Sequence, residues 1–246
     1  MNDIAEKNLN PDQFIDSRKS FYSKSFLTFE SEGIAKKLQT DGFFFYEAAI
    51  TNEMVDQILS EVENLPLGFN KNDVHPVSFF RQIFFSHCLA GSRTIVNLIS
   101  DPFVLQICRN FLGFDFRLKC QRYYTSGRGY QLDWHSDNKT VDNEKTEING
   151  LVFIIYLTDT YDGELQVVKG SNNWSGDSLS NDFADKELRK NYEKDILSLP
   201  GPRGSIVITD TYTIHRTRKL TTKGFVRKSL FFQIDDDLLH SAKNYR

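Results

Sequence analysis

The spacing of apolar residues predicts helices in the first part of the chain. Residues 30–39 place apolar side chains at helical intervals, and residues 42–46 resemble a short strand. Thr51 stands where an N-cap would begin an amphipathic helix with Met54, Ile58, Leu59 and Val62. Asp101-Pro102, a capping residue followed by proline in the first turn, predicts the start of another helix.

From about residue 116 the pattern changes to short β-rich runs separated by turn residues. Turn signals include Asp162-Gly163 and Pro200-Gly201-Pro202. The predicted strands are residues 117–124, 151–157, 164–168, 205–209 and 228–234. Helices followed by many short strands predict an α+β fold whose strands form a sandwich or a barrel.

Two long polar stretches, residues 138–150 and 172–199, interrupt the strands, and the second contains a helical piece around residues 186–194. Loops of this length in a compact domain are typical of lids or binding loops. We expect one domain over residues 1–246. Residues 1–25 would form a loosely ordered arm, residues 26–115 a helical support with the first strand, and residues 116–246 a β-rich core.

Composition narrows the class of protein. The 246 residues are 39% apolar and 26% charged, with a net charge of −3 and a pI of about 6.0, so no global basic surface is available for nucleic acid. The three cysteines are widely spaced and form no CxxC pair, which favours reduced thiols. A polar N-terminus and the lack of a long apolar run predict a soluble cytoplasmic protein without a membrane partner.

Candidate chemistry begins at His135-Ser136-Asp137. In a strand, residues i and i+2 point to the same face, so the imidazole and the carboxylate would converge. Two histidines and one carboxylate hold iron in a facial triad that leaves three positions open. His215, which follows a glycine-led apolar strand and a polar bend, is the candidate second histidine. A polar turn that merely contains a histidine and an acid is the alternative.

Arg227 opens an apolar run, residues 228–233, and is therefore predicted to start a core strand. Burying a guanidinium there is costly unless an anion accompanies it, and its fork matches a carboxylate. The alternative is an arginine that reaches solvent from a strand edge.

The order of these segments resembles the phytanoyl-CoA dioxygenase family of Fe(II)/2-oxoglutarate oxygenases. Residues 134–137 resemble the family's W-H-x-D motif, and residues 162–172 resemble its N-G-x-L-x-V-x-P-G-S-H segment. Residues 204–215 resemble its G-D-x-x-x-F segment that ends in histidine. The similarity covers roughly residues 30–235 and implies a double-stranded β-helix, or jelly-roll, with the N-terminal helices packed outside.

The resemblance implies that His135, Asp137 and His215 hold Fe(II). It also implies 2-oxoglutarate and O2 as co-substrates, with Arg227 pairing with the far carboxylate of 2-oxoglutarate. Family members that halogenate lack the carboxylate ligand, so Asp137 favours hydroxylation or desaturation.

Two further co-substrate contacts follow from the resemblance. Thr217 would share the carboxylate bound by Arg227. Tyr124, on the strand before His-x-Asp, stands where related oxygenases contact 2-oxoglutarate, and a tyrosine that only packs in the core is the alternative.

The chain departs from the family pattern at several positions. Lys169 and Asn172 replace the proline and histidine of P-G-S-H, in a turn where the fold tolerates both. Arg216, Arg218 and Lys219 replace small residues after the distal histidine. Two interpretations of this basic cluster are open: contact with an anionic substrate, or a solvated strand end.

The sequence therefore predicts a 2-oxoglutarate-dependent hydroxylase that acts on an unactivated C–H bond of a small molecule. A metal-binding jelly-roll with a hydrolytic or a non-catalytic role is the alternative from another class. Arg227 discriminates, because a hydrolase needs no buried carboxylate clamp. A hydroxylase of a peptide or protein is a further alternative.

Overall fold

The computed structural model describes residues 20–63, 82–85, 88–138, 140–141, 144–145, 148–175 and 183–236. Most of the expected N-terminal arm and parts of both expected lid loops lie outside these residues. The end of the expected arm is held in place rather than loose. The Phe21 N–H and the Ser20 hydroxyl donate to Asp101, and Tyr22 is buried.

The predicted helices form, and two of them begin at the predicted N-cap residues, Thr51 and Asp101. The described helices include α1 (Ser31–Asp41), α2 (Asn52–Glu63), α4 (Cys88–Gly91), α5 (Arg93–Ile99) and α6 (Pro102–Leu112), with a 3-10 turn, η2, at Phe26–Thr28. The Thr51 hydroxyl accepts the Met54 N–H, and the Asp101 carboxylate accepts the Phe103 N–H at 2.9 Å. Both side chains therefore satisfy backbone donors that a helix start leaves unpaired.

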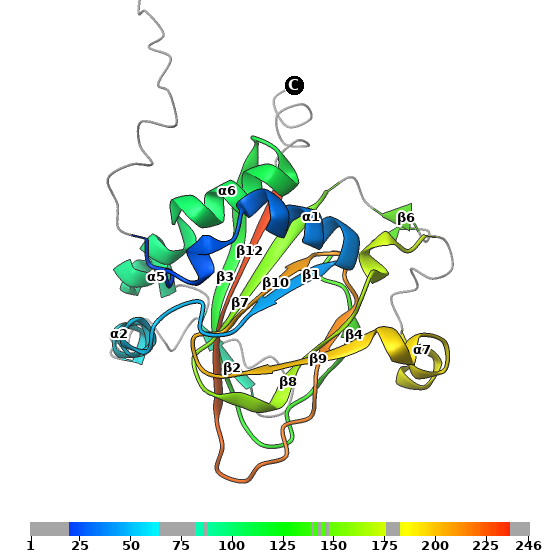
Figure 1. Cartoon of the computed structure of the whole chain (residues 1–246). Coiled ribbons are helices and arrows are strands. Elements are labelled where there is room, and N and C mark those ends of the chain that lie inside the picture. The colour runs from blue at the N-terminus through cyan, green and yellow to red at the C-terminus, as the bar shows by residue number, and fades with distance from the viewer. Residues whose placement is uncertain are drawn as a thin grey trace, which may run out of the picture.

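Two antiparallel sheets face each other and form the predicted double-stranded β-helix (Figure 1). The major sheet has the order β1 (Phe43–Tyr46), β10 (Ile206–Asp210), β7 (Gly150–Tyr156), β12 (Arg227–Asp236), β3 (Phe116–Ser126), β2 (Gln82–Phe85). The minor sheet has the order β4 (Leu132–His135), β11 (His215–Thr217), β8 (Thr160–Val168), β9 (Ile196–Gly201).

The second expected lid loop, residues 172–199, contains more regular structure than its polar sequence suggested. It holds most of η3 (Ser171–Asn173), then α7 (Asp185–Tyr192) and η5 (Glu193–Asp195), and it leads into β9. Strand β9 escaped prediction because Pro200 lies within it. An edge strand tolerates proline, and β9 is the edge of the minor sheet. The first loop contains a short hairpin of β5 (Thr140–Val141) and β6 (Glu144–Lys145).

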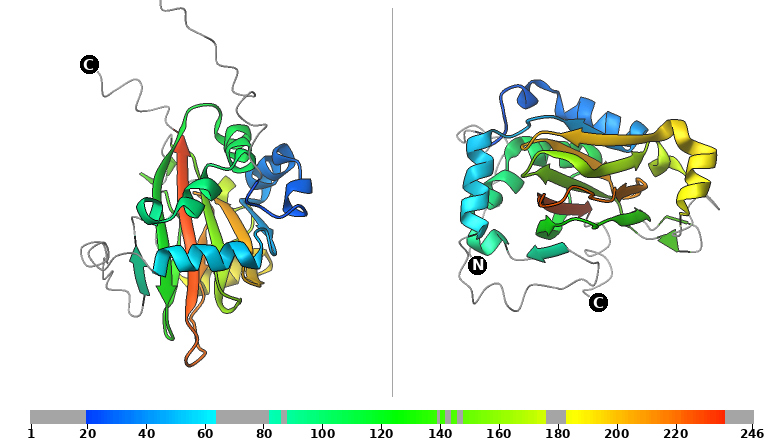
Figure 2. Two further views of the ribbon diagram at one scale, coloured as in Figure 1. Left: turned by 90° about the vertical axis from the view of Figure 1, so that its left-hand side faces the viewer. Right: turned by 90° about the horizontal axis from the view of Figure 1, so that it is seen from below.

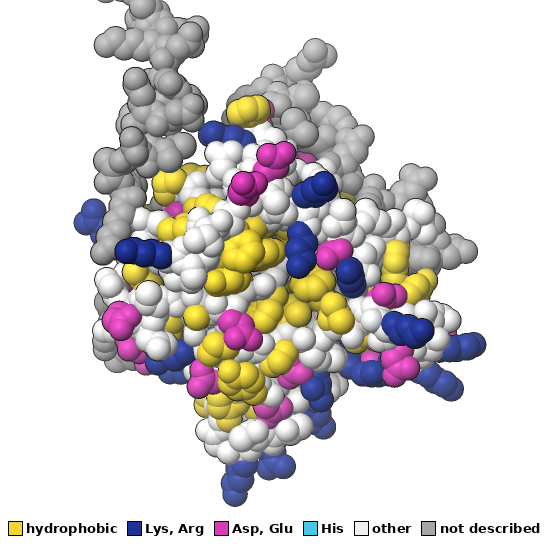
Figure 3. All heavy atoms as spheres, in the orientation of Figure 1, with side chains coloured by type: hydrophobic (Ala, Val, Ile, Leu, Met, Phe, Trp, Pro, Cys, Tyr) yellow, Lys and Arg dark blue, Asp and Glu magenta, His cyan; other side chains and the backbone are white. Residues whose placement is uncertain are grey.

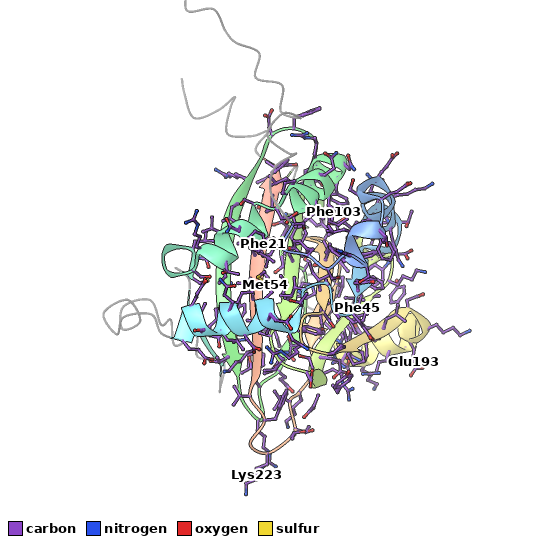
Figure 4. The ribbon with its side chains drawn as sticks, turned by 60° about the vertical axis from the view of Figure 1, so that its left-hand side comes forward. Phe21, Phe45, Met54, Phe103, Glu193 and Lys223 are labelled. Atoms are coloured by element: carbon purple, nitrogen blue, oxygen red, sulfur yellow. The ribbon has the colours of Figure 1, made fainter. Side chains whose placement is uncertain are left out.

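The helices cover the outer face of the major sheet, and α2 runs across its strands (Figure 2). One apolar cluster joins the helices to this face, with Phe153 of β7 stacked on Phe232 of β12 at 4.6 Å between ring centroids. Phe21, Met54 and Phe103 pack against the cluster from the helical side (Figure 4). The main core therefore lies between helices and sheet, away from the space between the two sheets.

The two family departures in the Gly170 turn have partners that fix this turn to α1. The Asn172 amide donates to the Leu38 and Gln39 carbonyls and to the Asp210 carboxylate. The Lys169 ammonium lies 3.5 Å from the Asp41 carboxylate. Asn172 thus satisfies carbonyls that the end of a helix leaves unpaired.

The surface is mixed in charge. On the face shown in Figure 3, hydrophobic side chains lie toward the middle, with Lys, Arg, Asp and Glu among and around them. Lys223 points away from the molecule at the tip of the loop between β11 and β12 (Figure 4). Of the described helices, none combines the length and apolar character needed to cross a bilayer. The cytoplasmic location stays a prediction.

Candidate metal centre and co-substrate pocket

A cavity of about 280 Å³ lies between the two sheets. Its walls come from both sheets and from the segments that join them. The major sheet contributes Gln82, Arg122, Tyr124, Ile154, Tyr156, Arg227, Ser229 and Phe231. The minor sheet contributes Leu132, His135, Leu165, His215 and Thr217, and Tyr130 and Asp137 come from connecting segments. Every site residue predicted from the sequence lines this one cavity.

His135 is the last residue of β4 and faces the cavity because the strand is irregular. Leu132 pairs with Thr217 and His135 pairs with His215, so β4 has one more residue than β11 over this interval. A bulge of this kind re-aims side chains, and here both Leu132 and His135 reach the cavity. The His135 Nδ1–H donates to the Asp133 carbonyl at 2.7 Å, which leaves Nε2 as the free ligand atom.

Asp137 lies just beyond β4, so its position does not come from strand alternation. The backbone N–H groups of Asp137 and Asn138 both donate to the Thr211 carbonyl, at 3.0 and 3.1 Å. Thr211 belongs to the turn between β10 and β11, the same turn that leads to His215. The two ends of the candidate metal site are therefore tied together through the backbone.

His215 is the first residue of β11. It follows a strand and a bend, as the sequence predicted. Its side chain is buried, and Nδ1–H donates to the Thr213 carbonyl at 2.9 Å. Both histidines thus carry the proton on Nδ1, which leaves Nε2 free to bind a metal in the cavity.

The three candidate ligands fit a metal ion. One ligand atom from each of His135, Asp137 and His215 lies within 4.8 Å of the others. His215 Nε2 is 3.5 Å from Asp137 Oδ2, which is buried and has no hydrogen-bond partner among the described residues. Two ligand atoms that each lie about 2.1 Å from a metal, at right angles to each other, are about 3 Å apart, which is close to the distance between His215 Nε2 and Asp137 Oδ2.

The electrostatics of the site keep the imidazole of His135 neutral. Burial, and then the neighbouring His215 ring at 4.3 Å between centroids, lower the pKa of His135 to about 4. A neutral imidazole is the form that binds a metal.

Arg227 opens β12 and is buried, so it does not reach solvent from a strand edge. Its guanidinium donates to the Gly163 carbonyl, and to the Ser126 hydroxyl at 3.4 Å, while Nε has no partner. No carboxylate of a described residue lies within ion-pair distance of it. Burial lowers the pKa of Arg227, and an anionic ligand in the cavity would offset this cost.

The other two predicted co-substrate contacts also face the cavity. Tyr124, on β3, is largely buried and its hydroxyl accepts from Arg122 at 3.1 Å; burial raises its pKa to about 12. Thr217, on β11, is buried two residues after His215. Sequence analysis did not predict that Arg122, Gln82 and Phe231 line the cavity. Alternation along β3 puts Arg122 on the same face as Tyr124, and alternation along β12 puts Phe231 on the same face as Arg227, so this signal could have found both.

The basic cluster after His215 belongs to the outside of the minor sheet. Arg216 pairs with Asp185 at 2.7 Å and lies over the Trp134 ring, and Arg218 pairs with buried Glu164 at 2.7 Å. Lys219 is exposed. None of the three is among the described residues that line the cavity. At this strand end Arg216 and Arg218 are therefore held by Asp185 and Glu164 on the outside of the sheet.

A jelly-roll whose two sheets enclose two histidines and an aspartate, with a buried arginine in the same cavity, has the architecture of Fe(II)/2-oxoglutarate oxygenases. The sequence model of the family described as phytanoyl-CoA dioxygenase (PhyH) matches residues 38–229. The chain therefore belongs to the phytanoyl-CoA dioxygenase family, whose members are oxygenases that use Fe(II), 2-oxoglutarate and O2. It is an oxidoreductase.

Solved structures show the same fold. HygX from Streptomyces hygroscopicus, solved with nickel and 2-oxoglutarate, is 18% identical over 83% of this chain and 87% of its own, with a TM-score of 0.64. EctD from S. alaskensis, solved with 2-oxoglutarate and 5-hydroxyectoine, is 17% identical over 90% and 80%, with a TM-score of 0.66.

A third structure with this fold is the α-ketoglutarate-dependent epimerase SnoN from nogalamycin biosynthesis. It is 15% identical over 84% of this chain and 83% of its own, with a TM-score of 0.64. No curated protein sequence matches the chain significantly.

Proposed function

We propose that this oxygenase hydroxylates an unactivated C–H bond of a small molecule. The observation that carries the proposal is the shared cavity of His135, Asp137, His215 and Arg227. Three candidate metal ligands from two distant segments meet there, together with an arginine that has no carboxylate partner among the described residues. A hydrolytic metal site would have no use for such a buried arginine.

Each residue has a defined part in this proposal. His135 and His215 would bind iron through Nε2, and Asp137 through Oδ2, which accepts no hydrogen bond from a described residue. Arg227 would bind the far carboxylate of 2-oxoglutarate, with Thr217 beside it. When bound, iron, 2-oxoglutarate and O2 would together supply the oxidant that attacks the C–H bond, with one oxygen atom going into succinate as CO2 is released and the other into the hydroxylated product.

The size of the cavity supports a small substrate. A cavity of about 280 Å³ between two sheets must hold 2-oxoglutarate as well, which leaves little room for a folded protein segment. HygX and EctD were solved with hygromycin B and 5-hydroxyectoine, which are both small molecules. SnoN is an epimerase, so the outcome of the reaction must be tested for this chain.

The test is iron binding under anaerobic conditions, followed by succinate release from 2-oxoglutarate in air, with a panel of candidate metabolites and product analysis by mass. We expect one iron per chain, and loss of both iron and succinate release in His215→Ala and Asp137→Ala. Asp133→Asn is the matched control, because it changes an exposed carboxylate on the same strand. Full succinate release by His215→Ala, or turnover without 2-oxoglutarate, would contradict the proposal.

A further inference from the structure

On the outer face of the minor sheet, one carboxylate contacts both strands that carry the candidate iron-binding histidines. This carboxylate belongs to Asp185, the first residue of α7. Its Oδ1 accepts the Nε1–H of Trp134 on β4 at 2.9 Å and lies 2.7 Å from Nη1 of Arg216 on β11. Trp134 directly precedes His135, and Arg216 directly follows His215. Asp185 therefore touches the neighbour of each candidate histidine ligand.

Arg216 has two further partners that hold its guanidinium in this place. The guanidinium carbon lies 4.5 Å from the centroid of the Trp134 ring, and Nε donates to the Gln166 side chain on β8 at 2.8 Å. Although burial would raise the pKa of Asp185, hydrogen bonds and the nearby arginines lower it, so the carboxylate is ionised near neutral pH. A charged contact thus joins α7 to three strands of the minor sheet.

Apolar packing seats α7 on the same face. Leu188 of α7 is buried in a cluster with Trp134, Val168 and Ile214, and α7 lies beside β4 at one end of the minor sheet (Figure 1). None of the described residues 183–195 lines the cavity. The helical part of the expected second lid loop therefore supports the minor sheet from outside and does not form a wall of the cavity.

The backbone pairing between β4 and β11 is short and irregular. β4 is an edge strand, β11 has three residues, and the register shifts just beyond the pair formed by His135 and His215. Each imidazole is oriented by the backbone carbonyl two residues before it. A shift of one strand against the other would therefore change the separation of the two Nε2 atoms. A contact that bridges the strands from outside resists such a shift.

We propose that Asp185 is a positioning residue for the metal centre, which holds β4 against β11 through Trp134 and Arg216 so that both histidines reach one ion. The inference rests on the proposed function, because it takes His135 and His215 as ligands. Removal of a group that orients a metal ligand typically lowers metal affinity by about 10- to 100-fold. Asp185 acts through two strands and its side chain is partly exposed, so we expect an effect near the lower limit.

The experiment titrates Ni(II) into the metal-free full chain by calorimetry, at a temperature where a thermal melt shows each variant to be folded. Asp185→Ala should bind Ni(II) about tenfold more weakly than wild type. Asp185→Asn keeps an acceptor for Trp134 but loses the charge, so its affinity should lie between those two. Glu187→Ala is the matched control, because it also removes an exposed acid from the first turn of α7, and its affinity should stay within about twofold of wild type.

Arg216→Gln should also weaken Ni(II) binding, and the double variant should lose less than the product of the two single losses, because both changes remove one contact. An Asp185→Ala chain that binds Ni(II) within about twofold of wild type overturns the inference, even where its melting temperature falls, and so do losses that multiply. Should Asp185→Ala not fold, Asp185→Asn and Arg216→Gln decide by the same criterion. A wild-type chain that binds no Ni(II), or binds it equally well after His135→Ala, overturns the proposed function itself.

Discussion

The two faces of the major sheet are built from the same strands but have opposite character. On the outer face, Tyr123, Phe153 and Phe232 are almost fully buried against the helices. On the inner face, the alternate residues Arg122, Tyr124, Arg227 and Ser229 line the cavity. Phe231 and Phe232 are neighbours in β12, yet one faces the cavity and the other the core.

The outer face therefore mainly stabilises the fold, whereas the inner face carries the candidate site. The outer face gains free energy by burying apolar surface, whereas the inner face carries Arg227, whose costly burial an anionic ligand would offset. Because side chains alternate along a strand, a change at one position alters one face and spares the other. Variants on the two faces should therefore differ in which property they change, stability or ligand binding, as well as in the size of the change.

The largest effect is expected on the outer face. Phe232→Ala should lower the free energy of unfolding by about 4 kcal/mol, because it removes a fully buried ring stacked on Phe153 and leaves a cavity in the core. Urea unfolding followed by circular dichroism measures this. A loss below about 1 kcal/mol would show that the helical layer does not depend on this contact.

On the inner face, Arg227→Gln should weaken 2-oxoglutarate binding by about 100-fold, or about 3 kcal/mol, because a charged two-point contact is lost. Metal affinity should not change. The unfolding free energy of the metal-free chain should stay within about 1 kcal/mol, since the arginine has no carboxylate partner to lose among the described residues. Calorimetric titration checks the first effect, and unchanged 2-oxoglutarate affinity refutes the assignment.

On the minor sheet, His135 should make the free energy of unfolding depend on pH. His135 has a folded pKa of about 4 against an ordinary value of 6.5, so between these values the unfolded chain binds more protons. Stability of the metal-free chain should fall as the pH drops through this window, by about 2 kcal/mol at pH 5 compared with pH 7. Urea unfolding at both pH values tests this, and His135→Gln should remove that part of the decrease.

The smallest effect is expected at Phe231. Phe231→Ala enlarges a cavity that already exists, so its unfolding free energy should fall by only about 1 kcal/mol, well below the loss at Phe232. Equal losses at the two positions, measured by the same urea titration, would remove the distinction between the faces.

Much of the fold followed from local pattern. Strand β7 is a near-continuous apolar run, β10 and β12 contain shorter apolar runs, and the caps at Thr51 and Asp101 mark helix starts. Strand β9 was missed because its proline is acceptable only at an edge, and edge position is a property of the assembled sheet.

The candidate site was found through the order of motifs, yet its geometry has sources that no motif contains. Asp137 is placed by the Thr211 carbonyl, and the orientation of His135 depends on the bulge in β4. Arg122 carried no signal of its own, because an arginine in a strand of mixed burial is ordinary until the opposite wall is known.

The sequence by itself determined which residues belong to strands and helices, and which side chains have the chemistry to bind iron and a carboxylate, because these depend on residue type and local spacing. Only the tertiary structure decided which arginines share the cavity with those ligands. Arg122 and Arg227 enter it, while Arg216 and Arg218 are paired outside it. That choice depends on strand register and on which anions fold nearby, and both are set by contacts between segments far apart in the chain.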